Sequence, residues 1–115
     1  MKIFATVSLL VMSSSCLADY VWSEAIPNEV HITPNGLVLK GEFNQSGISC
    51  ATGPKSIYLP KSDPNFEFKL SLALTANAAG KKIKVLLPTV NQTCYQISAL
   101  GYVPIVHEYY WQLKN

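Results

Sequence analysis

Hydrophobic and polar residues alternate along several short stretches of the chain, and turn residues separate these stretches. Residues 29–33 alternate with a period of two, as do residues 37–43, which is typical of half-buried β-strands. The sequence Pro34-Asn35-Gly36 lies between them, and Asn-Gly favours a tight hairpin because both residues tolerate a positive φ. We therefore expect a hairpin, and the buried face of its second strand should carry Leu37, Leu39 and Phe43.

The same pattern predicts further strands, whereas residues 20–27 are interpreted as irregular. These strands are expected at residues 48–51, 56–59, 82–87, 94–100 and 102–113. In the last of them Val103, Ile105, His107, Tyr109 and Trp111 would share one face. Pro104 lacks an amide proton, so we expect it at a sheet edge or at the start of a strand.

Residues 62–80 are compatible with two structures. Alternation from Phe66 to Leu74 is typical of a strand, but Ser62 or Asp63 can cap a helix, Pro64 suits a first turn and Gly80 suits the position after the end. The stretch is long for a strand and ordinary for a helix. We therefore expect a helix, with Phe66, Leu70, Ala73, Leu74 and Asn77 near one face.

Short strands around a single helix indicate a mainly β protein with one helix, of the α+β class. A compact barrel or a strongly bent antiparallel sheet could bury the apolar face of that helix. We expect a small OB-like barrel, or a bent antiparallel sheet packed on the helix.

The first eighteen residues have the layout of a secretory signal peptide: Lys2, an apolar run and small residues before Asp19. The apolar run is shorter than the roughly 20 residues that span a bilayer. Cys16 raises the alternative of lipid attachment, but Ser13 stands where such signals usually have Leu. We expect cleavage after Ala18, a single domain at residues 19–115, a secreted or periplasmic location and no stable membrane insertion.

Charge argues against nucleic acid as a partner. The chain contains no Arg, the residue most used for bidentate phosphate and base contacts, and the mature net charge would be about +1. Lys81, Lys82 and Lys84 form the main charge cluster. Proximity to a helix C-terminus or protection of an outward strand face explains this cluster without a ligand.

Two cysteines, Cys50 and Cys94, would remain after cleavage. In an oxidising compartment such a pair usually forms a disulfide, here closing a loop of about 45 residues. The alternatives are a catalytic thiol or a metal site, but the chain has no CxxC motif and no Cys/His cluster.

Candidate catalytic chemistry is sparse. His31 falls on the polar face of a predicted strand, and His107 and Glu108 are adjacent strand residues that would point to opposite faces. No nucleophile elbow, zinc-protease helix or phosphate loop is present, so we expect no enzyme, metal or cofactor. Residues 44–46 and 91–93 fit the N-glycosylation acceptor pattern, which matters only in a eukaryotic secretory pathway.

Aromatic residues gather near both ends of the mature chain. Aromatic faces stack on sugar rings and anchor protein interfaces, although ordinary core and edge packing also uses them. The candidate binding aromatics are Tyr20, Trp22, Tyr109, Tyr110 and Trp111.

A longer pattern begins at Cys50. It comprises Cys50-Ala51, Ser56-Ile57-Tyr58, a capped helix with Leu72 and Ala76, and Gly80-Lys81-Lys82-Ile83-Lys84-Val85. Over about 40 residues it resembles the middle of the B subunits of AB5 toxins of the subtilase-cytotoxin and typhoid-toxin type, and of small exported bacterial proteins with a similar pattern. The resemblance implies an OB-type barrel, pentameric assembly and binding of sialylated glycans.

The chain departs from this family at functional positions. It lacks the family's additional cysteines and has no counterpart of its glycan-contacting serine, so no sugar-binding residue is carried over. We expect an exported non-enzymatic binding module whose partner is a cell-surface glycan and which can form homo-oligomers. The alternatives are a periplasmic or surface protein with a structural or interaction role, whose partner is another exported protein, or an inhibitor of an unknown partner.

Overall fold

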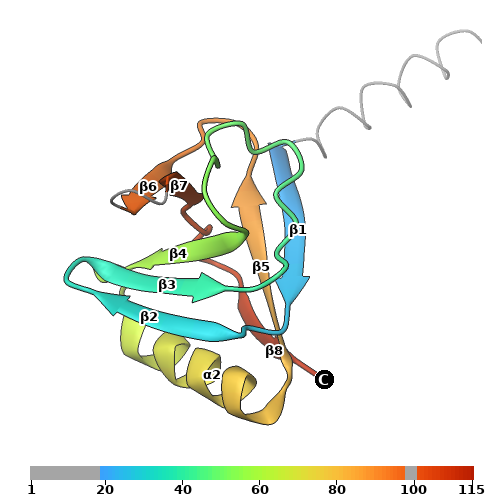
Figure 1. Cartoon of the computed structure of the whole chain (residues 1–115), viewed down its shortest axis with the longest axis vertical. Helices are drawn as coiled ribbons and strands as arrows, with labels where there is room; N and C mark the ends of the chain where they lie inside the picture. Colours follow the sequence, from blue (N-terminus) through green and yellow to red (C-terminus); the bar gives the residue numbers. More distant parts are fainter. Residues whose placement is uncertain (1–18, 98–100) are drawn as a thin grey trace, which may run out of the picture.

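The computed structural model describes residues 19–97 and 101–115 (Figure 1). Residues 1–18, where a signal peptide is expected, lie outside this part, and so do residues 98–100 of the strand expected at 94–100. The described chain has eight strands and one helix, which confirms a mainly β fold with a single helix. In order they are β1 (Tyr20–Ala25), β2 (Glu29–Thr33), β3 (Gly36–Lys40), β4 (Ser56–Pro60), α2 (Phe66–Ala79), β5 (Lys82–Pro88), β6 (Cys94–Ile97), β7 (Gly101–Pro104) and β8 (Trp111–Lys114).

The strands form three antiparallel sheets. One has the order β1-β5-β8, a second the order β2-β3-β4, and β6 pairs with β7 in a two-stranded sheet. An isolated parallel bridge between Tyr58 and Ile105 links β4 to the chain after β7. Among the described residues the strands therefore do not close into a single barrel.

The main core lies between the two three-stranded sheets and α2, which packs against β2, β5 and β8. A smaller cluster of Val38, Tyr58 and Val103 lies on the other face of the β2-β3-β4 sheet, under the β6–β7 hairpin. Tyr95 of the hairpin stacks on Tyr58 with ring centroids 4.0 Å apart. Because both of its faces are covered, β3 is buried at Gly36, Leu37, Val38 and Leu39.

The structure confirms a helix in this segment, as its length predicted, but the helix begins later than expected. The N-cap is Asn65, which makes no side-chain capping bond, whereas Asp63 Oδ1 accepts a hydrogen bond from the Asn65 amide at 2.8 Å. Gly80 ends the helix with a left-handed φ of 66°, as expected. The buried face carries Lys69, Ala73 and Ala76, and its small alanines allow the helix to approach the sheets closely. Leu74, which was expected on this face, is half exposed.

Three strand predictions need correction. Residues 20–27 are not irregular, since β1 pairs with β5 along its whole length. Residues 48–51 form turns rather than a strand, with hydrogen bonds from Ile48 N to Gln45 O and from Ala51 N to Ile48 O. Residues 102–113 are two strands in different sheets, because the chain leaves the hairpin after Pro104 and joins β5 where the His107 amide donates to Leu86 O.

The predicted disulfide joins Cys50 to Cys94. It ties the turn before β4 to the first residue of β6. The Gln92 side chain reinforces this junction, because its Oε1 accepts from the Cys50 amide at 3.1 Å and its Nε2 donates to Gly47 O at 2.8 Å.

Candidate aromatic binding surface

The outer face of β1 begins the candidate site. Strand alternation turns Ser23 and Ala25 into the protein and leaves Tyr20 and Trp22 outside. Trp22 pairs across the sheet with Leu86 of β5, and its side chain is 48% exposed.

The segment between β7 and β8 brings a second set of aromatics to the same strand from the other side. Its backbone is held where Val106 N donates to Tyr58 O and His107 N donates to Leu86 O. Val85 of β5 then pairs with Trp111 of β8. Residues 107–110 therefore lie beside β5 on the edge opposite β1, and the two sets of aromatics flank Leu86.

Ring contacts join the two sets. Trp22 and Tyr110 meet edge to face with centroids 5.0 Å apart, and Tyr20 and His107 do the same at 5.1 Å. His107 also contacts the Tyr109 ring at 4.9 Å. These five side chains form what we call the aromatic surface: Tyr20, Trp22, His107, Tyr109 and Tyr110.

One lysine completes the aromatic surface. Lys84 Nζ lies 4.6 Å from the centroid of the Trp22 ring, a favourable cation–π position. Glu24 bridges the other two lysines of this sheet face, Lys114 at 3.0 Å and Lys82 at 3.5 Å. The hydrogen bond from Lys114 lowers the pKa of the Glu24 carboxyl, and the positive charge of both lysines acts in the same direction. Among the described residues Lys84 has no carboxylate partner.

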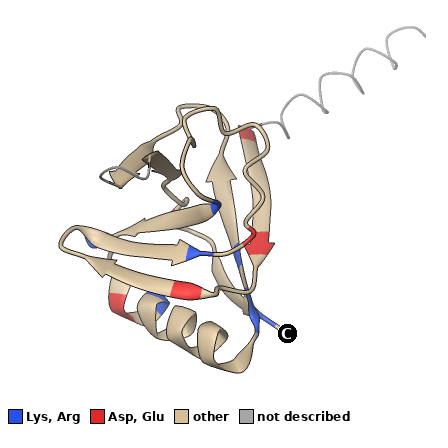
Figure 2. Ribbon diagram, in the orientation of Figure 1, with Lys and Arg blue, Asp and Glu red and all other residues tan. Residues whose placement is uncertain are grey.

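The exposed rings and the free ammonium suit a ligand with both apolar and polar faces. The C–H face of a sugar ring can stack on Trp22 or Tyr109, which is 78% exposed. Ligand hydroxyl or carboxylate oxygens can accept hydrogen bonds from Lys84 and the tyrosine hydroxyls. In Figure 2, both acidic and basic residues occur along the strands and the helix.

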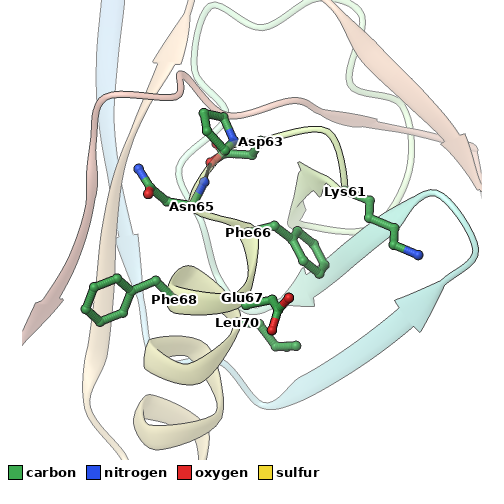
Figure 3. A pocket seen from close by; sticks show the side chains of 8 residues that line it. Lys61, Asp63, Asn65, Phe66, Glu67, Phe68 and Leu70 are labelled. Atoms are coloured by element: carbon green, nitrogen blue, oxygen red, sulfur yellow. Dashed lines mark hydrogen bonds between the residues drawn. The ribbon is translucent and has the colours of Figure 1, made fainter.

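Another hollow is separate from this surface. It has a volume of about 640 Å³ and lies at the start of α2 (Figure 3). Lys61 and Phe66 point to one side of the helix start and Phe68 to the other, so its side chains do not converge on a ligand position. A hollow of about 340 Å³ between Phe68, Tyr109 and Trp111 borders the aromatic surface.

The structure places the predicted site residues in two groups. Tyr20, Trp22, Tyr109 and Tyr110 come together, whereas Trp111 packs against the main core. Sequence reasoning missed Lys84 and His107 as members of the surface. Alternation of Tyr20, Trp22 and Glu24 could have revealed the outward face of β1, but the pairing of β1 with β5 is not visible in the sequence.

The structure also shows the surroundings of the other candidate groups that the sequence suggested. His31 is exposed and hydrogen-bonds Glu29 Oε1 at 2.9 Å. Within residues 19–97 and 101–115, no three His, Cys, Asp or Glu side chains gather closely enough to hold a metal ion. In the same part of the chain, no helix has the length and hydrophobicity needed to span a membrane.

The chain matches no known family model, no curated protein and no solved structure.

Proposed function

We propose that this protein is an exported, non-enzymatic binding module that recognises a cell-surface glycan through the aromatic surface. The observation that carries the proposal is the meeting of four exposed tyrosine and tryptophan rings with Lys84 on one sheet face. Aromatic side chains are costly to leave in water, so a cluster of them on the surface is typical of a binding site.

The proposal extends to an OB-type, toxin B-subunit-like fold. Two three-stranded antiparallel sheets, with the helix inserted between β4 and β5, support it. The Cys50–Cys94 disulfide is compatible with a secreted or periplasmic location, where such bonds persist.

Self-association is part of the same proposal. The outer face of α2 exposes Phe68 and Leu74, and β2 and β8 each leave one sheet edge unpaired in the described chain. Apolar helix faces and open edges are surfaces on which copies of a chain associate. Native mass spectrometry of the mature protein should therefore show a closed oligomer.

The test is binding to an array of sialylated and neutral oligosaccharides. Replacing Trp22 with Ala should reduce glycan binding at least tenfold, because the main stacking platform and the contact with Lys84 are lost together. Tyr102→Ala is the matched control, since Tyr102 is an exposed aromatic on β7 outside the aromatic surface. Equal losses in both variants, or no binding of any glycan by a monomeric wild-type protein, would count against the proposal.

A protein partner is the second candidate. Tyr109 and Tyr110 are exposed next to the hollow that Phe68 borders, which is the kind of aromatic patch that anchors protein interfaces. Capture of another exported protein, or inhibition of one, would then depend on Tyr109 and Phe68 together, whereas the glycan affinity of a single subunit should not change in Phe68→Ala.

A further inference from the structure

A buried charged pair connects the start of α2 to the segment that carries Tyr109 and Tyr110. Lys69 is the fourth residue of the helix, and only 7% of it is exposed. Its Nζ donates to Asp63 Oδ2 and to Glu108 O, each at 2.7 Å. The Asp63 side chain is itself only 4% exposed.

Ordinary stabilisation does not explain a lysine at this position. A cation in the first turns of a helix opposes the helix dipole. Removing an ammonium and a carboxylate from water costs about as much as their attraction returns, so an apolar pair of similar volume would serve the core as well. The charged pair fixes the position of the groups around it, because the ammonium must lie where both a carboxylate and a backbone carbonyl can accept hydrogen bonds from it.

The carbonyl that Lys69 binds is in the middle of the segment between β7 and β8. Upstream, the amides of Val106 and His107 are anchored on Tyr58 and Leu86; downstream, pairing with β5 begins at Trp111. Between these anchors, the Tyr109 amide donates to His107 Nδ1 at 3.2 Å and Lys69 holds Glu108 O.

We propose that Lys69 is a positioning residue that fixes residues 108–110 and so holds Tyr109 and Tyr110 in place on the aromatic surface. Asp63 acts through Lys69 by neutralising and orienting its ammonium. Asp63 is itself fixed, since its Oδ1 accepts from the Asn65 amide just before the helix. The part of this inference that concerns affinity rests on the proposed function, whereas the geometry can be tested without a ligand.

The experiment compares three variants by NMR. Lys69→Met keeps the apolar stem but removes the ammonium, and Asp63→Asn/Lys69→Met also removes the carboxylate that would be left unpaired. Asp63→Asn alone is the intermediate variant, because Lys69 can still donate to Glu108 O but has lost the carboxylate that orients its ammonium. We expect both Met variants to lower the ¹⁵N heteronuclear NOE at Tyr109 and Tyr110 and to weaken the Trp22–Tyr110 ring NOE, with little change elsewhere. In Asp63→Asn alone, both the NOE at Tyr109 and Tyr110 and the ring NOE should fall less than in the Met variants.

Glycan affinity gives the second readout. If the proposed function is correct, the double variant should bind at least tenfold more weakly with its unfolding midpoint nearly unchanged. Wild-type protein that binds no glycan would overturn the proposed function but not the positioning role. Unchanged amides and ring NOEs in the double variant would overturn the positioning role whatever happens to binding. NMR changes spread over the whole chain, or failure of both Met variants to fold, would also overturn the positioning role, because the Lys69–Asp63 pair would then be a general requirement for folding.

Discussion

His107 makes one of the two ring contacts that join the N-terminal and C-terminal parts of the aromatic surface. Its ring contacts both Tyr20 and Tyr109, and its Nδ1 accepts a hydrogen bond from the Tyr109 amide. An accepting Nδ1 places the proton of the neutral ring on Nε2. The two contributions, ring contact and hydrogen-bond acceptor, can be separated by substitution.

Two replacements of His107 should have different effects. His107→Phe keeps a ring against Tyr20 and Tyr109 but leaves the Tyr109 amide without its acceptor, so that amide proton should move upfield in the NMR spectrum. His107→Asn offers an acceptor close to the position of Nδ1, so the Tyr109 amide should shift less, but NOEs to the Tyr20 ring should disappear. Identical spectra for the two variants at Tyr20 and Tyr109 would show that His107 does not connect them.

Glu24 should make the stability of the β1-β5-β8 sheet depend on pH. Its pKa is lowered from 4.5 in the folded protein, so its contribution to stability is present above the unfolded pKa and is lost as pH falls through the folded value. Glu24→Gln should therefore lower the thermal unfolding midpoint at pH 7 in low salt, and the difference from wild type should be smaller at pH 3, below the unfolded pKa of 4.5. The effect should be small and should fade in about 1 M salt, because exposed ion pairs are screened. An equal difference at both pH values would contradict the assignment.

At the residue scale, the aromatics could be found from the sequence but the surface they form could not. Aromatic side chains just after residue 19 and near residue 110 were visible as candidates. Trp111 and Tyr110 are neighbours in the sequence, yet Trp111 packs on the core while Tyr110 meets Trp22. That difference depends on where β8 begins, which only pairing with β5 determines.

At the element scale, segments that are long or bounded by Gly and Pro could be predicted from the sequence. The points where the chain passes from one sheet to another could not. Gly80 and the length of residues 62–80 were sufficient to predict the helix. The strict alternation through residues 102–113 predicted one strand, but the segment crosses from one sheet to another, and tertiary pairing overrides local pattern there. Lys69 was not singled out, because a lone lysine in a helix is normally solvated.

The position of β8 predicts which C-terminal aromatic stabilises the fold. Trp111→Ala should destabilise the protein by about 2 kcal/mol, because Trp111 packs partly buried against the core. Tyr109→Ala should cost less than about 0.5 kcal/mol, since that side chain is largely exposed. Urea unfolding of both variants measures the difference. Similar losses would mean that Tyr109 contributes to packing rather than to an exposed surface.

At the scale of the whole molecule, the disulfide links the β6–β7 hairpin to the turn before β4, and both cysteines pack against the main core. The β1-β5-β8 sheet and α2 share the main core, whereas the β6–β7 hairpin packs on the far face of β2-β3-β4 through the smaller cluster. A two-stranded hairpin is marginally stable by itself. The covalent link at Cys94, the first residue of β6, therefore adds to the hydrogen bonds that Thr52 N and Gly53 N donate to Tyr102 O in holding the hairpin.

Removal of the disulfide should consequently loosen the hairpin before it affects the rest of the protein. In Cys50→Ala/Cys94→Ala the free energy of unfolding should fall by about 2–4 kcal/mol, because a loop of 44 residues is no longer closed in the unfolded chain. Hydrogen exchange should rise first at β6 and β7, while β5, paired on both sides, keeps its protection. Cys50→Ser/Cys94→Ser serves as the control for the polarity of the replacement and should behave alike. If protection instead falls first in β5, or evenly along the chain, then the hairpin is an integral part of the main core and the two-cluster description of the molecule is wrong.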